Sequence, residues 1–163
     1  MKRVGKLELT TPGDREVVMT RTFAAPCALV WEAYTRPEHL TRWLGIHNGW
    51  TFPVCEMDFR VGGRYRWVWR SPTGEEMGMG GVYREIVTGE RIVATERFDN
   101  AWYEGGAVVT AEFREQEGVT TLILTVLYDS REIRDAVLRT PMESGVALGF
   151  DNLEQLLPTI AAG

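Results

Sequence analysis

The sequence is poor in cysteine and histidine and has no long hydrophobic run. Its 163 residues include 2 Cys and 2 His, too few for a disulfide framework, so we expect Cys27 and Cys55 to stay unpaired in a reducing cytoplasm. His39 and His47 lack the spacing of a metal-binding pair, and no local pattern joins them to Cys or carboxylate side chains, so no metal site is predicted. No apolar run reaches the roughly 18 residues of a membrane-spanning helix, and the N-terminus lacks a signal-peptide pattern.

Lysine is almost absent, and positive charge is not concentrated anywhere along the chain. Only Lys2 and Lys6 are lysines, and the formal net charge is −5, which argues against nucleic-acid binding. The composition, 44% hydrophobic and 25% charged, is that of an ordinary globular protein, and the length fits one domain. We therefore expect an N-terminal extension over residues 1–14, which ends in a Thr-Pro-Gly-Asp turn signal and is either loosely held or a short edge strand, and a single domain over residues 15–163.

Patterns of alternation and turn residues predict one strand, two short helices and then a run of strands. Glu16–Ala24 alternates as a strand does, Pro26 fits the first turn of a helix, and Pro37 separates that helix from a second short one. Thr35 and Glu38 have the spacing of a capping box for the second helix. Further strands, separated by glycine-rich turn signals, are predicted over Trp50–Asp58, Tyr65–Arg70, Met77–Ile86, Arg91–Phe98, Ala107–Arg114 and Thr120–Tyr128.

The C-terminal segment changes to a helical period. A short helix over Arg131–Leu138, with Ser130 as its cap, precedes a Thr-Pro-Met-Glu start signal at residues 140–143. The apolar stripe that follows predicts a long helix, which Pro158 should end or kink. Because strands and helices are segregated along the chain, the predicted fold class is α+β, with a curved antiparallel sheet of about seven strands wrapped around the C-terminal helix.

Short motifs, in order along nearly the whole chain, resemble those of one known family. They are Arg21-Thr22-Phe23-Ala24-Ala25-Pro26, Pro37-Glu38-His39-Leu40-x-x-Trp43, Asp58-x-Arg60-x-Gly62-Gly63, Gly81-Val82-Tyr83-Arg84-Glu85-Ile86 and a Gly-x-x-x-Asn-Leu-x-x-Leu pattern from Gly149 to Leu157. The chain resembles the START-like (SRPBCC) superfamily and, within it, the heat-shock-protein-90 ATPase activator homologue family, single-domain prokaryotic type. The resemblance implies a helix-grip fold, in which the sheet surrounds the long C-terminal helix.

One predicted strand concentrates large aromatic side chains on a single face. Residues alternate across a strand, so Tyr65, Trp67 and Trp69 should share one face, opposite Arg66 and Arg70. Such a face is either ordinary core or the lining of an apolar pocket with a few polar anchors, and both alternatives stay open. For the pocket, the predicted ligand-binding residues are Trp43, His47, Tyr65, Trp67, Trp69, Met77, Met79, Glu96, Phe113, Leu148 and Phe150, with Trp43 and His47 at its rim.

The charged residues around the double-glycine turn have two interpretations. In the first, Asp58 and Arg60 brace the turn at Gly62 and Gly63 through hydrogen bonds. In the second, Glu56 or Asp58 points into the concave face of the sheet, where burial would raise the pKa of its carboxyl.

Glu96 is a further candidate because it alternates with apolar residues of its strand. If Ile92, Ala94 and Phe98 point inward, Glu96 is a buried acid. A buried acid needs a partner, since an unpaired charge is costly to remove from water. A ligand, Arg97 or a tryptophan N–H group could serve.

Three functional hypotheses follow. The first is binding of a small hydrophobic or amphipathic ligand between the sheet and the C-terminal helix, without a cofactor. The second, implied by the resemblance, is a chaperone-associated protein of the stress response. The third is a cavity-based enzyme, although no catalytic motif is present; it would need His47 or an inward Glu56, Asp58 or Glu96 as acid or base. A homodimer through an exposed strand edge is a further hypothesis.

Overall fold

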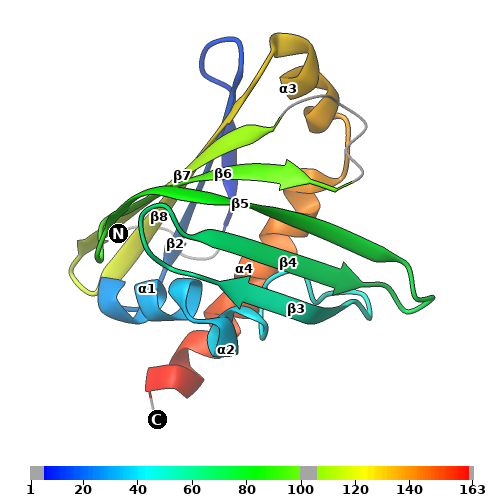
Figure 1. Ribbon diagram of the computed structural model, residues 1–163. Helices are drawn as coiled ribbons and strands as arrows, with labels where there is room; N and C mark the ends of the chain where they lie inside the picture. Colours follow the sequence, from blue (N-terminus) through cyan, green and yellow to red (C-terminus); the bar gives the residue numbers. More distant parts are fainter. Residues whose placement is uncertain (1–5, 100–105, 162–163) are drawn as a thin grey trace.

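The computed structural model describes residues 6–99 and 106–161 and confirms the α+β class. An 8-stranded antiparallel sheet, in the order β1-β2-β8-β7-β6-β5-β4-β3, curves around the C-terminal helix (Figure 1). The strands are β1 (Glu8–Thr10), β2 (Glu16–Phe23), β3 (Thr51–Met57), β4 (Arg64–Arg70), β5 (Glu76–Val87), β6 (Arg91–Phe98), β7 (Ala107–Gln116) and β8 (Val119–Tyr128).

The sheet has more strands than predicted because the segment before residue 15 contributes β1. This strand pairs antiparallel with β2, with Leu9 opposite Met19, and Leu9 packs against the core. Of the two alternatives for this segment, loosely held chain or a short edge strand, the structure confirms the edge strand; three residues are too few to show an alternating pattern.

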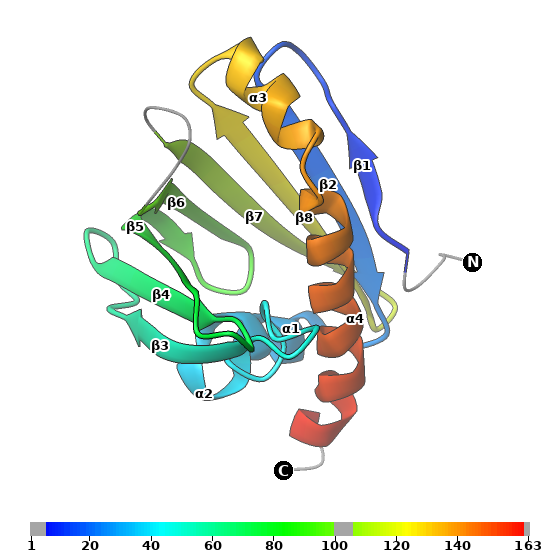
Figure 2. The ribbon, with the colours of Figure 1, turned by 90° about the vertical axis from the view of Figure 1, so that its right-hand side faces the viewer.

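The helices confirm the predicted helix-grip arrangement. They are α1 (Cys27–Thr35), α2 (Pro37–Leu40), α3 (Arg131–Leu138) and α4 (Met142–Ala161). α4 runs across the concave side of the sheet, and α1 and α2 lie at one end of that side (Figure 2). Within residues 6–99 and 106–161, no helix is long and apolar enough to cross a membrane.

One of the predicted helix caps forms and two do not. The long helix begins at Met142, and the Thr140 hydroxyl donates to the Val137 carbonyl at 2.6 Å instead of capping that helix as predicted. The Ser130 hydroxyl accepts a hydrogen bond from the Ile133 N–H at 3.2 Å, which is the predicted cap of α3. The predicted capping box of α2 does not form, because Thr35 is the last residue of α1 and its hydroxyl donates to the Trp31 carbonyl at 2.7 Å. α2 begins at Pro37 without a side-chain cap.

α4 does not end at Pro158, which was one of the two outcomes predicted for this proline. The helix extends to Ala161, so Pro158 lies inside it. Proline removes one backbone N–H donor from the helix, but the following turn places Ile160 against the core. Burial of that side chain offsets the lost hydrogen bond and lets the helix continue.

The core is most closely packed where α4 meets α1 and the neighbouring strands. Apolar side chains that are at most 4% exposed include Val17, Phe23, Val30, Leu40, Trp43, Phe113, Leu122, Phe150, Leu153 and Leu157. Arg21 is 2% exposed in the same region, and its guanidinium pairs with Asp151 at 3.0 Å and Glu154 at 3.5 Å. These ion pairs partner a buried cation and hold α4 on β2.

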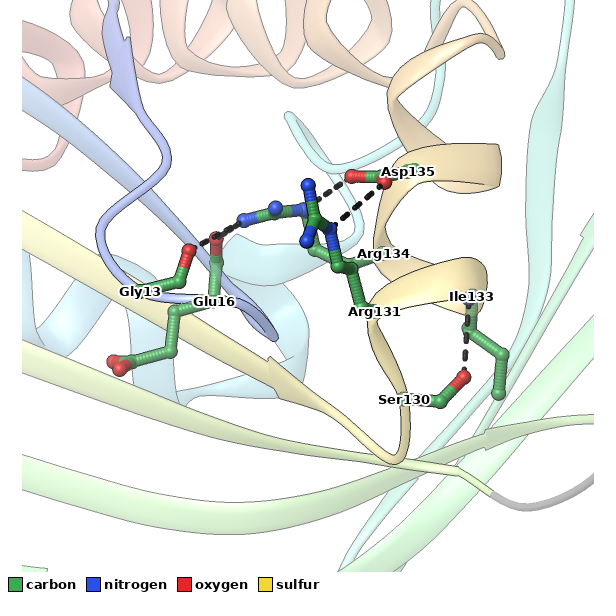
Figure 3. Close-up of polar contacts among 7 residues, drawn as sticks. All are labelled: Gly13, Glu16, Ser130, Arg131, Ile133, Arg134 and Asp135. Atoms are coloured by element: carbon green, nitrogen blue, oxygen red, sulfur yellow. Dashed lines mark hydrogen bonds and ion pairs between the residues drawn. The ribbon is translucent and has the colours of Figure 1, made fainter.

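A second buried arginine holds α3 to the first hairpin of the sheet. Arg134 is 7% exposed, and its guanidinium donates to the Glu16 carbonyl at 3.0 Å and the Gly13 carbonyl at 3.4 Å (Figure 3). It also donates to the Asp135 carboxylate at 2.8 Å, which Arg131 reaches from the surface at 3.6 Å. Arg134 therefore fixes the helix that leads into α4.

We expect Arg134→Met to lower the free energy of unfolding by about 2 kcal/mol, because the carbonyls of Gly13 and Glu16 lose a charged donor. Arg131→Met is the matched control, since the Arg131 side chain is 67% exposed, and it should change stability by less than about 0.5 kcal/mol. Urea denaturation measures both variants. Equal losses would mean that Arg134 does not hold α3 in the way described.

Candidate functional site

The aromatic residues of β4 share one face and look into the concave side of the sheet. The ring centroids of Tyr65 and Trp67 lie 4.6 Å apart, and those of Trp67 and Trp69 lie 6.1 Å apart. On β5, Met79 pairs with Trp67, and Tyr83 contacts Tyr65 with a centroid distance of 5.3 Å. We refer to these five residues, Tyr65, Trp67, Trp69, Met79 and Tyr83, as the aromatic wall.

The aromatic wall is part of an unbroken series of ring contacts through the interior. In order, the series is Phe52, Trp69, Trp67, Tyr65, Tyr83, Phe59, Trp31, Phe113, Tyr34, Trp43, Phe150 and Phe23, with neighbouring centroids 4.6–6.1 Å apart. Strands, the β3–β4 turn, α1 and α4 all contribute rings. The fold thus gathers aromatic side chains that are far apart in the sequence.

The two ends of this series differ in how closely they are packed. Trp43, Phe113 and Phe150 are 1–4% exposed, and the Trp43 Nε1 donates to a main-chain carbonyl of α1 at 3.0 Å. These predicted ligand-binding residues are core residues, and Trp43 does not lie at a rim. At the other end, Trp67 is only half-buried and Met77, which pairs with Trp69 on the same face, is 45% exposed.

The Trp69 indole forms a hydrogen bond that holds a loop in place, and the Trp67 indole does not. The Trp69 Nε1 donates to the Leu44 carbonyl at 3.0 Å, which ties the loop after α2 to the sheet, and the residue is 5% exposed. Gly45 in that loop has a φ of 72°, and a Cβ there would overlap the indole ring of Trp69. Trp69 therefore positions the loop, whereas no described residue accepts a hydrogen bond from the Trp67 indole N–H.

Glu96 lies on the inward-facing side of β6. Ile92 and Ala94, which alternate with it, are buried, and it pairs with the buried Ala107 of β7. Burial raises the pKa of the Glu96 carboxyl to about 7, although by accessible area the residue is half-buried rather than fully buried. The carboxyl is thus desolvated by surrounding protein while part of the residue stays accessible.

Tyrosine hydroxyls lie around this carboxyl. Burial, and then the charge of Glu96, raise the pKa of both Tyr34 and Tyr65. The Tyr65 hydroxyl donates to the carbonyl of Thr95 at 2.6 Å. In residues 6–99 and 106–161, neither a hydrogen bond nor an ion pair to the Glu96 carboxylate is present.

Two polar atoms of the aromatic wall are buried without a hydrogen-bond partner in the described part of the chain: Trp67 Nε1 and Tyr83 Oη. Cys55 lies opposite Trp67 on β3, and burial raises the pKa of its thiol to about 11. Buried polar atoms normally have a partner, because an unpaired one costs about 1–3 kcal/mol. The wall therefore carries hydrogen-bonding capacity that the described protein does not use.

Tyr34, Tyr83 and Cys55 belong to this cluster but are not among the predicted site residues. Tyr83 follows Met79 at an even spacing on β5, so the alternation of that strand could have identified it. Cys55 follows from the alternation of β3 in the same way. Tyr34 comes from α1, and no local pattern relates a helical tyrosine to an acid on β6.

Leu148 lies away from the aromatic wall. It is 41% exposed and precedes the exposed Gln155 by about two helical turns, on the solvent-facing side of α4. The inward side of the helix carries Phe150, Leu153 and Leu157, which are all buried. Leu148 therefore does not line the interior, contrary to the prediction.

His47 lines an open hollow of about 340 Å³ beside α4. The other lining residues are Arg42, Ile46, Asn152, Gln155, Leu156 and Thr159. A second open hollow, of about 470 Å³, lies between the start of the chain, β2 and the N-terminal half of α4; its lining residues are Lys6, Leu7, Arg21, Thr140, Pro141, Glu143, Ser144, Ala147 and Asp151. Neither hollow includes a residue of the aromatic wall.

The double-glycine turn connects β3 to β4 and is held by an ion pair and by main-chain hydrogen bonds. The Arg60 guanidinium pairs with both oxygens of Asp58, at 3.1 and 3.0 Å, and the Gly63 N–H donates to the Arg60 carbonyl at 2.8 Å. Gly62 lies at the tip, with a φ of 85°. Both Asp58 and Glu56 are exposed, so the interpretation that either points into the concave face is wrong.

The described part of the chain holds few groups that could act together on a metal or a substrate. Within residues 6–99 and 106–161, no group of three or more His, Cys, Asp or Glu side chains could hold a metal ion. Cys27 and Cys55 are free thiols, as expected. In the same part of the chain, no hydrogen bond joins Glu96 or His47 to another candidate acid or base. An apolar molecule with one polar group suits this arrangement.

Solved structures share this fold over nearly the whole chain. A protein from Rhodobacter sphaeroides is 28% identical, with a TM-score of 0.86 over 94% of this chain and 99% of that chain. A protein from Chromobacterium violaceum is 30% identical, with a TM-score of 0.72 over 86% of this chain and 96% of that chain. A protein from Nitrosomonas europaea, 21% identical with a TM-score of 0.82, covers 94% of this chain and 100% of its own and shows the fold alone. No curated protein matches the chain.

A family model matches residues 24–158, from the end of β2 into the last turns of α4. The matched segment therefore includes the aromatic wall, Glu96 and the double-glycine turn. On this match, the chain belongs to the family described as activator of Hsp90 ATPase homolog 1-like protein, which confirms the resemblance seen in its motifs.

Proposed function

We propose that the protein binds a small hydrophobic or amphipathic molecule against the aromatic wall. The observation that carries the proposal is the combination of a half-buried Trp67 with two buried polar atoms that lack hydrogen-bond partners in the described chain, Trp67 Nε1 and Tyr83 Oη. An interior built for stability alone packs its rings and pairs its polar atoms, as the other end of the series does with Trp43. A ligand with an apolar body and a polar group would supply both missing partners.

A matched pair of tryptophan variants tests this proposal with N-phenylnaphthylamine, an uncharged probe that fluoresces in apolar sites. Trp67→Leu should weaken probe binding by about tenfold or more and lower the free energy of unfolding little, because Trp67 is half-buried. Trp43→Leu should do the reverse, losing about 2–3 kcal/mol of stability while its folded fraction binds the probe normally, because Trp43 is 1% exposed.

Native mass spectrometry of the purified protein complements the probe. A defined small-molecule adduct, identified in the denatured extract, would name the ligand class. If Trp67→Leu and Trp43→Leu lose the same stability and probe binding is unchanged in both, Trp67 is ordinary core and the proposal fails.

A second function is suggested by the family description, which names an activator of the Hsp90 ATPase. In that case the protein would bind a cognate Hsp90-type chaperone in the cytoplasm and stimulate its ATP hydrolysis under stress. An ATPase assay with the purified chaperone tests this directly, and an unchanged rate at saturating protein would reject it. Size-exclusion chromatography tests the predicted homodimer.

A further inference from the structure

We propose that the ligand of the aromatic wall carries a positive charge, such as an amine or quaternary ammonium group, which Glu96 binds. This inference rests on the ligand-binding function proposed above and adds the charge class of the ligand. Charge balance, hydrogen-bonding capacity and the neighbouring rings all favour a cation.

The charge of Glu96 is not balanced by the described protein. The buried Arg21 is already neutralised, because it pairs with Asp151 at 3.0 Å and Glu154 at 3.5 Å. It also lies on β2, which β8 and β7 separate from β6 in the sheet. Within residues 6–99 and 106–161, Glu96 forms no ion pair, so its ionised carboxylate leaves the wall with a net negative charge.

Among the described residues, the groups that face Glu96 cannot supply a positive charge. Tyr34 from α1 and Tyr65 from β4 are close enough to interact with it electrostatically, and Tyr83 from β5 and Cys55 from β3 extend the same cluster. All of these groups are neutral or, on losing a proton, negative. The inward residues of β7 and α4 on this side are apolar: Ala107, Val109, Val146, Phe150 and Leu153.

Beside Glu96 two groups offer acceptors to a ligand, whereas the unpartnered Trp67 N–H and Tyr83 hydroxyl of the wall can donate to another part of it. The Tyr65 hydroxyl donates its proton to the Thr95 carbonyl at 2.6 Å, so towards a ligand its oxygen can only accept. The Glu96 carboxylate is also an acceptor. An ammonium group, which only donates, fits both; a carboxylate ligand would meet acceptors and a like charge.

The rings beside Glu96 add a second attraction for a cation. Tyr65 contacts Trp67 at 4.6 Å and Tyr83 at 5.3 Å between ring centroids. The face of an aromatic ring carries partial negative charge and attracts an organic cation, most strongly where water is excluded. Glu96 with these rings therefore has the composition of a site for an organic amine.

Three probes with the same naphthalene body test the charge class: naphthylmethylamine, naphthylmethanol and naphthoic acid. At about pH 8, where Glu96 is mostly ionised because its pKa is about 7, the amine should bind at least about tenfold more tightly than the alcohol. At about pH 5 that preference should fall to about twofold or less, because the carboxyl is protonated. Glu96→Gln should remove the preference at both pH values, because the amide carries no charge.

The outcomes separate this inference from the function on which it rests. Equal affinity for amine and alcohol, or an undiminished preference in Glu96→Gln, would overturn the cation proposal while ligand binding stands. Tighter binding of naphthoic acid would also overturn it. Failure of all three probes and of N-phenylnaphthylamine would remove the proposed function itself. Circular dichroism and urea denaturation check independently that Glu96→Gln is folded.

Discussion

Replacement of Gly63 by alanine should destabilise the protein by about 3 kcal/mol or more, because the position has no room for a side chain. A Cβ on Gly63 would overlap the carbonyl oxygen of Asp58 and lie 3.0 Å from that of Arg60. Both are main-chain atoms of the same turn, held by hydrogen bonds such as the one from the Asp58 N–H to the Arg64 carbonyl at 2.9 Å. The turn must open before the methyl group fits.

Gly62 is the matched control, because its backbone conformation is restricted whereas the space around it is not. Its φ is 85°, but a Cβ there would have nothing within 4 Å. Gly62→Ala therefore introduces backbone strain without a clash and should cost about 1 kcal/mol. Urea denaturation of both variants compares the two effects; a larger loss in Gly62→Ala would mean that backbone conformation, not space, determines the need for glycine here.

The double-glycine turn also holds one residue of the aromatic wall in place. The Tyr83 N–H donates to the Gly63 carbonyl at 2.9 Å, and the Tyr83 carbonyl accepts from the Gly62 N–H at 2.8 Å. The Tyr83 ring in turn packs against Tyr65. Distortion of the turn should thus reach the site, although Asp58 and Arg60 themselves lie on the surface.

The strands were predictable because alternation records which side chains face the core. The prediction over Arg91–Phe98 coincides with β6, and the other strand ranges differ from the observed ones by one or two residues at an end. The same alternation identified the inward face of β4, with Tyr65, Trp67 and Trp69 together. Turn residues were equally informative, since the double-glycine motif connects β3 and β4 where expected.

The composition of the site was less predictable, because it depends on long-range packing. Tyr34, Tyr65 and Glu96 come from α1, β4 and β6, and no sequence pattern links them.

Leu148 shows a second limit, the rotational phase of a helix, because each residue of a helix is rotated by about 100° from the next. The buried Gly149 faces the Trp43 carbonyl, whereas Leu148, one position earlier, is exposed.

Glu96→Gln should raise the free energy of unfolding by about 2–3 kcal/mol at about pH 8 and leave it nearly unchanged at about pH 4. Burial raises the pKa of Glu96 from 4.5 to about 7 in the folded protein, so between these values the folded state holds a proton that the unfolded state has lost. The stability from this proton is complete below pH 4.5 and is lost as the pH rises through 7. The full shift corresponds to about 3 kcal/mol, which partial solvent access reduces.

Urea denaturation of the ligand-free protein across this pH range measures the effect. Glu56→Gln removes a carboxylate from the exposed side of β3, so this control should keep the loss of stability with rising pH that Glu96→Gln abolishes. If Glu96→Gln keeps it too, the Glu96 carboxyl is well solvated and does not belong to a desolvated site.

Because ionised Glu96 costs stability in the ligand-free protein, a bound cation would recover that stability. A cationic ligand should therefore raise the melting temperature more at about pH 8 than at about pH 5, whereas an uncharged ligand should raise it by a similar amount at both.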